Sequence, residues 1–224
     1  MKVEIWSDVM CPFCYIGKRR FEMALKEFEY ADDIDLQWKS YQLNPDMETD
    51  PDRNINEYLA EAKGWSPEQA RQMNQRVTNM AEEVGLEYNM DQAVVANSFD
   101  AHRLIQFAKT EGCGSEMEEA LFKAYFTDGK NIADYEILVS LASEAGLDSD
   151  KAKEVLNNDK FANQVKHDIQ IAKSMQVQGV PFFLFHRKYA VSGARESEVF
   201  LKALKQSWND WLQDDEGVAT VEEL

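Results

Sequence analysis

The chain has 224 residues, 44% of them hydrophobic and 29% charged, and its formal net charge is −17. This length is enough for one elaborated domain or for a core with an inserted module. The charge argues against a nucleic acid or an anionic membrane as partner, because phosphate groups repel such a surface. No apolar run is long enough to span a membrane, and no basic and apolar leader follows Met1. We therefore expect a cytoplasmic protein.

The first segment predicts a β-α-β unit: a strand at about 3–7, a helix at about 12–30 and a strand at 35–41. Cys11 and Cys14 stand at the start of the helix, in the C-x-x-C spacing of redox centres. Unpaired N–H groups and the helix dipole stabilise an anion there, which favours a thiolate at Cys11. Cys11 is the expected nucleophile, and Cys14, one turn further, is the expected resolving cysteine.

Other uses of this cysteine pair fit the composition poorly. A structural zinc site needs four ligands, and the remaining candidates, Cys113, His102, His167 and His186, are not closely paired in the sequence. A cluster held by cysteines alone needs four of them, and the chain has three. A structural disulfide that closes so small a loop would gain little stability from chain entropy. We expect no metal site, and we interpret the pair as redox-active.

The middle of the chain predicts an all-helical domain inserted at 46–175. A turn-rich acidic stretch from Asn44 to Asp52 comes first, and we expect no strand for more than a hundred residues after it. Apolar residues recur there at helical spacing, as in Met117, Leu121 and Tyr125. The predicted helices span 55–62, 67–84, 94–110, 116–126, 135–145, 149–157 and 161–175.

Strand character returns near the C-terminus, with a hairpin formed by 180–185 and 189–191 and a last helix at about 197–212. This order of elements predicts a thioredoxin fold, α/β in class, in which 1–45 and 176–213 form one discontinuous domain. The last residues, 214–224, predict an acidic solvated tail. Pro181 opens a strand, so we expect a cis Val180–Pro181 peptide that leaves the Val180 backbone free to pair with substrate. An edge strand or an ordinary turn is the alternative.

Three ordered motifs carry a resemblance to a known family, over the chain to about Leu212. They are residues 6–18 (WSDVMCPFCYIGK), 97–104 (NSFDAHRL) and 179–183 (GVPFF). The chain resembles the DsbA-like branch of the thioredoxin superfamily and, within it, the FrnE-like proteins. The resemblance implies a thiol-disulfide oxidoreductase of the protein disulfide isomerase kind, which acts on protein or small-molecule thiols. It implies Cys11 and Cys14 as the dithiol and Pro181 as the cis-proline.

Two further functions stay open. The same branch contains 2-hydroxychromene-2-carboxylate isomerases and kappa-class glutathione transferases, which typically have a serine where this chain has Cys11. A second cysteine has no use in that chemistry, so this glutathione-dependent function ranks second. Glutathione nevertheless remains a candidate co-substrate or reductant, and no tightly bound cofactor is expected. A chaperone-like peptide-binding module is the third hypothesis, and the sequence leaves the recycling partner and a homodimer open.

The candidate substrate-binding residues are Pro12, Phe13, Val180, His102 and Asn97. We expect the side chain of Phe13 to be partly exposed beside the cysteines, where it offers substrate an apolar surface. His102 and Asn97 are candidates because they belong to the 97–104 motif. A structural role is the alternative for His102, because a histidine on an amphipathic helix is more often structural.

Two other residues near these motifs have ambiguous roles. Asp8 either moves a proton to or from Cys14 or caps the turn, and the sequence does not discriminate between the two. Cys113, which lies between two glycines, is expected to be a bystander thiol.

Overall fold

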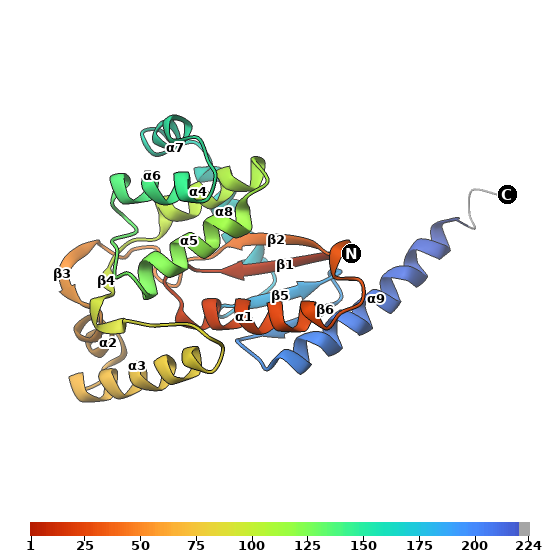
Figure 1. The fold of residues 1–224 in the computed structure, drawn as a ribbon, viewed down its shortest axis with the longest axis horizontal. Helices are drawn as coiled ribbons and strands as arrows, with labels where there is room; N and C mark the ends of the chain where they lie inside the picture. Colours follow the sequence, from red (N-terminus) through yellow and green to blue (C-terminus); the bar gives the residue numbers. More distant parts are fainter. Residues whose placement is uncertain (220–224) are drawn as a thin grey trace.

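The computed structural model describes residues 1–219, which contain a four-stranded central sheet. β1 is parallel to β2 and antiparallel to β5, which in turn pairs with β6, so the order is β2-β1-β5-β6. The β-α-β start and the C-terminal hairpin thus meet in one sheet (Figure 1), and the predicted α/β fold class is confirmed. The strands are β1 (Lys2–Ser7), β2 (Asp35–Ser40), β5 (Phe182–Phe185) and β6 (Tyr189–Ser192).

Helices surround this sheet, and those that come between β2 and β5 in the chain correspond closely to the predicted ones. Four of them begin at a residue whose side chain accepts a hydrogen bond from the first helical turn, and one of these caps, Ser66, forms a reciprocal capping box with Gln69. The helices are α1 (Pro12–Lys26), α2 (Ile55–Lys63), α3 (Pro67–Glu82), α4 (Phe99–Thr110), α5 (Gly114–Phe126), α6 (Tyr135–Glu144), α7 (Ser149–Leu156), α8 (Ala162–Ser174) and α9 (Ser197–Ala219).

An aromatic core fixes α1 and α9 against one face of the sheet. Strand alternation sends Phe183 and Phe185 of β5 to this face. Phe21 of α1 packs on both rings, with centroids 5.4 and 6.1 Å away, and Phe200 of α9 lies 4.5 Å from Phe183. Large aromatic side chains contribute much of a core's stability. The start of α1, where the two cysteines lie, is therefore held at the end of β1.

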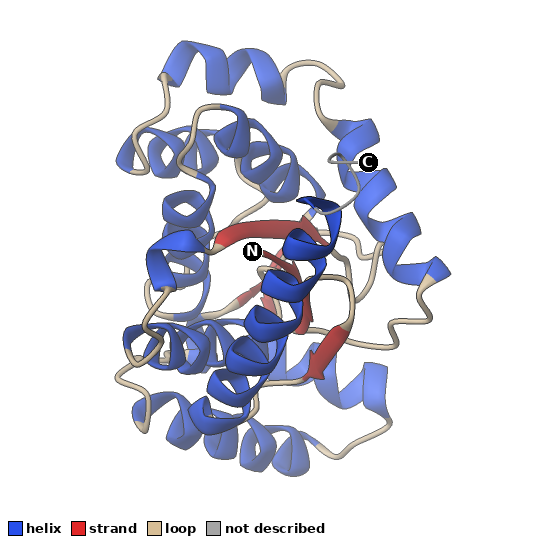
Figure 2. Ribbon diagram, turned by 90° about the vertical axis from the view of Figure 1, so that its right-hand side faces the viewer, coloured by secondary structure: helices blue, strands red, loops and turns tan. Residues whose placement is uncertain are grey.

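A buried carboxylate attaches α8 and α4 to the opposite face. The indole Nε1 of Trp6 donates to the backbone oxygen of Asp168 at 2.9 Å. The Asp168 carboxylate accepts from the backbone N–H of Ser40 at 3.1 Å and from Gln106 Nε2 at 2.6 Å, and Lys39 Nζ lies 3.4 Å away. A buried charge is tolerated when it is paired and hydrogen-bonded in this way. Figure 2 shows the resulting layers, with the strands enclosed by helices.

A second, two-stranded sheet corrects the expectation that the middle of the chain contains no strand. β3 (Asp50–Asn54) pairs antiparallel with β4 (Val94–Val95). Two aspartates and a proline give β3 little strand propensity, so its conformation depends on a partner far along the chain. Because β4 uses Val94 and Val95, α4 begins at Phe99 and not at Val94 as predicted.

The last helix is longer than predicted. α9 continues to Ala219, so the expectation of a tail from residue 214 is wrong for its first residues. Asp214 accepts hydrogen bonds from Lys188 Nζ at 2.6 Å and from His186 Nε2 at 3.0 Å, which attaches the helix to the β5–β6 turn. The rest of the predicted tail, 220–224, lies outside the described residues.

The sheet is formed by the two ends of the chain, and α2 to α8 come from the segment between β2 and β5 (Figure 1). The predicted boundaries, 46–175 for the helical domain and 1–45 with 176–213 for the other, remain predictions. Within the described residues, the helices are too short or too polar to cross a membrane.

Candidate active site

The two cysteines lie at the N-terminus of α1. Cys11 is the N-cap residue, with extended backbone, and Pro12 occupies the first helical position. The backbone N–H of Cys11 donates to the oxygen of Asp8 at 2.9 Å, which closes a tight turn after β1, and the N–H of Cys14 donates to the oxygen of Cys11 at 2.9 Å. Both side chains are in the free thiol form and point into the protein, with 3% and 1% of each residue exposed.

Cys14 is the more protected of the two thiols. Burial, then the hydrogen bond and the charge of Cys11, raise the pKa of the Cys14 thiol well above its ordinary value. Contacts with the backbone of Asp8 and with the Ser7 side chain act in the opposite direction. A thiol in this position stays protonated until it reacts, which suits the resolving role predicted for it.

The loop before β5 faces Cys11. The Val180–Pro181 peptide bond is cis, and the Cys11 thiol donates to the backbone oxygen of Val180 at 3.5 Å. Gly17 of α1 lies directly behind the proline, where a Cβ atom would be 2.9 Å from Pro181 Cγ. The absence of a side chain at Gly17 thus lets α1 and this loop approach each other. The structure brings the first and third sequence motifs together around one sulfur atom.

Asp8 is buried and its carboxylate holds backbone. Oδ1 accepts from the N–H of Met10 at 3.3 Å, and Oδ2 accepts from the N–H of Leu43 at 2.7 Å. The second contact attaches the segment after β2 to the cysteine turn. Of the two roles left open by the sequence, the geometry therefore supports the cap of the turn.

His102 and Asn97, the other two candidates, occupy supporting positions. His102 is 1% exposed and lies behind the motif, with Nε2 3.4 Å from Asp8 Oδ1. The Asn97 amide donates to the oxygens of Met47 at 2.8 Å and of Pro45 at 3.2 Å, so it fixes the segment after β2. A direct contact of either residue with substrate stays a prediction.

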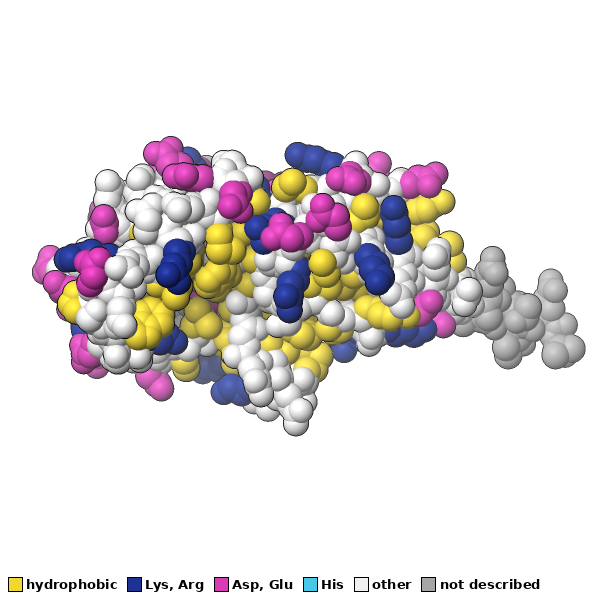
Figure 3. All heavy atoms as spheres, turned by 90° about the horizontal axis from the view of Figure 1, so that it is seen from below, with side chains coloured by type: hydrophobic (Ala, Val, Ile, Leu, Met, Phe, Trp, Pro, Cys, Tyr) yellow, Lys and Arg dark blue, Asp and Glu magenta, His cyan; other side chains and the backbone are white. Residues whose placement is uncertain are grey.

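At the rim of the site, Phe13 is 37% exposed, whereas Tyr88 is buried beside the motif. The Tyr88 hydroxyl donates to the oxygen of Pro12 at 2.8 Å. Burial, then the charge of Cys11, raise the pKa of Tyr88. The segment after α3 therefore covers the start of α1, and Figure 3 shows further hydrophobic side chains exposed between charged ones on the face seen from below.

Sequence reasoning missed two buried polar residues behind the cysteines. Ser7, the last residue of β1, donates from its hydroxyl to Oε1 of Glu118 in α5 at 2.7 Å. The available signal was the position of Glu118, which precedes Leu121 by three residues and Phe122 by four on the apolar face of that helix. A carboxyl group on a core-facing stripe requires a buried partner.

A charged cluster attaches α5 to α1 close to the cysteines. Glu119 of α5 accepts from Lys18 Nζ at 2.5 Å and from the Tyr15 hydroxyl at 2.5 Å, and it also pairs with Arg19. Burial alone would raise the pKa of Glu119, but the hydrogen bonds from Arg19 and Lys18 lower this pKa to about 2. The helical segment is thereby held against the motif-bearing helix.

We expect this cluster to stabilise the protein in a pH-dependent way. A carboxyl group whose pKa is lowered on folding stabilises the fold above its unfolded pKa, here 4.5, and this contribution is lost as the pH falls toward about 2. Glu119→Gln should therefore lower the free energy of unfolding at pH 6 by on the order of 1–2 kcal/mol, since a partly exposed pair is screened by solvent. Urea unfolding of both proteins between pH 6 and pH 3 measures this difference, and a gap that does not narrow on acidification contradicts it.

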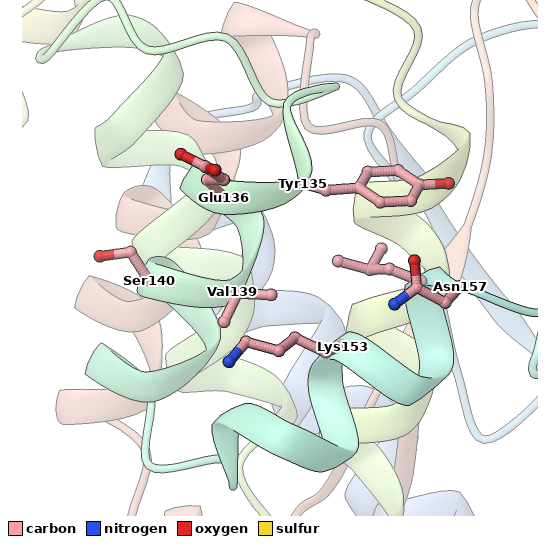
Figure 4. Close-up of a pocket in the computed structure, with 7 residues that line it drawn as sticks. Tyr135, Glu136, Val139, Ser140, Lys153 and Asn157 are labelled. Atoms are coloured by element: carbon pink, nitrogen blue, oxygen red, sulfur yellow. The ribbon is translucent and has the colours of Figure 1, made fainter.

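A separate groove between α6 and α7, with a volume of about 520 Å³, contains no residue of the cysteine motif. Figure 4 shows Tyr135, Val139 and Lys153 along it. The described residues contain no group of three or more His, Cys, Asp or Glu side chains placed to hold a metal ion.

A dithiol at the first turn of α1, facing a proline loop in this sheet topology, defines a redox protein of thioredoxin fold. The family model described as a DSBA-like thioredoxin domain matches residues 2–205, and the chain belongs to this family. The predicted DsbA-like resemblance is confirmed, and with it membership of a thiol-disulfide oxidoreductase family.

Individual relatives agree with this assignment. The uncharacterized protein YwbO of Bacillus subtilis (strain 168) is 29% identical over 206 residues, which cover 90% of this chain and 94% of that protein. The crystal structure of a probable DsbA oxidoreductase from Streptomyces coelicolor has a TM-score of 0.89 and 37% identity, covering 93% of this chain and 90% of that one. A 2-hydroxychromene-2-carboxylate isomerase, with a TM-score of 0.65, 15% identity and coverage of 97% and 99%, shares the fold.

Proposed function

We propose that this protein catalyses thiol-disulfide exchange with protein or small-molecule thiols, as FrnE-like oxidoreductases do. The observation that carries the proposal is the position of the two cysteines, with Cys11 at the helix N-terminus under the Val180 carbonyl and Cys14 buried one turn along. Membership of the DSBA-like family and a TM-score of 0.89 to a probable DsbA oxidoreductase support it.

The mechanism follows from thiol chemistry. The thiolate of Cys11 attacks one sulfur of a substrate disulfide, so a mixed disulfide forms and the other substrate sulfur leaves as a thiolate. Cys14 then attacks Cys11, which closes the intramolecular disulfide and releases the second substrate thiolate. In the oxidising direction, the same steps run in reverse. The exposed ring of Phe13 and the Val180 backbone are the surfaces we assign to substrate contact.

The proposal includes a cytoplasmic location and glutathione as co-substrate or reductant. A structure with GSH of DsbM from Pseudomonas aeruginosa, described as a cytosolic disulfide reductase, has the same fold, with a TM-score of 0.66, 13% identity and coverage of 93% of this chain and all of that one. A reducing compartment suits a dithiol that cycles.

The experiment that tests the proposal is the reduction potential of the pair. Cys113→Ser protein is equilibrated with glutathione buffers and its free thiols are counted, and we expect one two-electron transition that involves both remaining cysteines. A potential of about −120 to −180 mV would mark an oxidant or isomerase, and one of about −270 mV a reductant. If no intramolecular disulfide forms, the proposal fails, and a glutathione-dependent transferase would then retain its activity in Cys14→Ser.

A further inference from the structure

The hydroxyl group of Tyr88 contacts the cysteine motif at a backbone atom. It donates to the oxygen of Pro12 at 2.8 Å, and Pro12 is the residue that follows Cys11 at the start of α1. A buried hydroxyl group needs a partner, but here the partner belongs to the peptide group that joins Pro12 to Phe13, which we call the motif peptide. The exchange mechanism has assigned no role to this contact.

Tyr88 is held toward that oxygen from two sides. Its ring stacks on Phe126 of α5, with centroids 4.8 Å apart, and on Tyr15 of α1, with centroids 6.1 Å apart. The next residue, Asn89, anchors the backbone, because its N–H donates to the oxygen of Phe126 and its side-chain amide to that of Thr127, both at 2.7 Å. The segment after α3 thus presents one hydroxyl group to the motif in a fixed position.

The neighbouring titratable groups leave the proton on this hydroxyl. Tyr15 donates its own proton to Glu119, with which Arg19 also pairs. Burial, then the charge of Cys11, raise the pKa of Tyr88, and the charge of Arg19 acts in the opposite direction with a smaller effect. Tyr88 therefore remains a hydrogen-bond donor when Cys11 ionises.

The other end of the motif peptide lies where a thiolate would be received. Cys11 is the N-cap residue of α1, and an N-cap side chain accepts from the N–H groups of the second and third helical residues, here Phe13 and Cys14. The N–H of Cys14 already donates to the oxygen of Cys11 at 2.9 Å, whereas that of Phe13 lies in the first turn, where no intrahelical partner exists. As a thiol, Cys11 donates to Val180; as a thiolate, it can only accept.

We propose that Tyr88 stabilises the thiolate of Cys11 through the motif peptide. The hydroxyl polarises the carbonyl group at one end of this peptide, which makes the N–H at the other end a stronger donor to the sulfur, because hydrogen bonds in a chain strengthen one another. Tyr88 is a positioning residue, since it acts through the backbone and does not touch the reacting atoms. The inference rests on the proposed function, in which the thiolate of Cys11 is the nucleophile.

A titration of the reduced protein measures this effect. The ultraviolet absorbance of the thiolate gives the ratio of thiolate to thiol at Cys11, with Cys113→Ser as the parent protein and Cys11→Ser as the blank. In Tyr88→Phe, which removes one oxygen atom, we expect this ratio to fall about two- to threefold at a pH where the parent is half ionised. The rate of attack on a substrate disulfide should fall on the acid side of its pH profile and reach nearly the same plateau at alkaline pH.

The matched control is Tyr125→Phe. The Tyr125 hydroxyl also belongs to a buried ring and donates to a backbone oxygen, that of Val94, at 2.9 Å. Both variants should lose a similar amount of stability, because each leaves one backbone oxygen without its hydroxyl donor. Only Tyr88→Phe should change the ratio of thiolate to thiol, whereas a purely structural role of Tyr88 predicts the same ratio in both variants.

Two further variants test the route through the motif peptide. Phe13→Pro removes the N–H group of this peptide, and proline is tolerated in the first turn of a helix. In that background Tyr88→Phe should have no further effect on the ratio, because the two changes interrupt one chain of hydrogen bonds. A fluorinated tyrosine incorporated at position 88 has a stronger hydroxyl donor and should raise the ratio, and it carries the test if Tyr88→Phe does not fold.

An unchanged ratio in Tyr88→Phe, an equal fall in Tyr125→Phe, or a fall that persists in the Phe13→Pro background would overturn the inference. The proposed function fails separately, and only if the parent protein forms no Cys11–Cys14 disulfide, because the ratio of thiolate to thiol is measured without substrate.

Discussion

Replacement of Cys11 by serine should abolish disulfide exchange, with a fall in rate of more than roughly 10³-fold, because no other thiol is placed to attack. Cys14→Ser should instead keep the first attack and accumulate a mixed disulfide with substrate, since the resolving thiol is gone. Insulin reduction measures the first effect, and mass spectrometry of the trapped protein measures the second.

The control for this pair is Cys113→Ser. Cys113 is the N-cap residue of α5, and burial, then the charges of Glu116 and Glu111, raise the pKa of its thiol. It is therefore a poor nucleophile, and its loss should leave exchange unchanged. Full activity of Cys11→Ser together with loss of activity in Cys113→Ser would contradict this assignment, because the nucleophile would then be Cys113.

Arg103→Met, which removes a buried charge, should destabilise the fold more than a change of charge on the surface does. The Arg103 guanidinium is 4% exposed and pairs with Asp100 at 2.6 Å, and its Nε donates to the oxygen of Lys160 at 2.9 Å. It also donates to the backbone oxygens of Val155 and Asn158, so it closes the connection between α7 and α8. Methionine leaves these acceptors unpaired, and we expect a loss of about 3 kcal/mol in the free energy of unfolding.

Guanidinium unfolding with linear extrapolation measures this loss. The matched control is Arg71→Met at an exposed position of α3, which should change the free energy of unfolding by less than about 0.5 kcal/mol. Arg103→Lys should recover only part of the loss, because an ammonium group does not reproduce a planar fork of donors. Equal stability of Arg103→Met and Arg71→Met would contradict this account of the α7–α8 connection.

The charged and apolar patterns of the sequence predicted most of the elements. Apolar periodicity identified α2, α3 and α5 to α8 within a few residues, because each helix buries one face. It failed at β3, whose proline and aspartates have little strand propensity, and at the end of α9, where Asp214 is held by Lys188 and His186. In both places a contact with a distant segment outweighs local preference.

The sequence by itself determined which reactive groups the candidate site contains. The C-x-x-C spacing at a helix start brings Cys11 and Cys14 together within one helical turn, so no tertiary contact is needed to predict a dithiol. The motif with Pro181 likewise pointed to the loop that faces them, although only the folded chain places that loop at Cys11 Sγ.

Tertiary structure alone decided what surrounds the dithiol. Ser7 and Glu118 are 111 residues apart and meet because α5 packs behind β1, a contact that no local pattern encodes. The fold also buries His102, which the sequence offered as a candidate substrate-binding residue, and turns Asn97 toward the segment after β2. Spacing along the chain predicts which reactive groups lie together within one helical turn. Burial of a titratable group, and the pKa shift that burial causes, arise only when segments distant in the sequence pack together and exclude water from it.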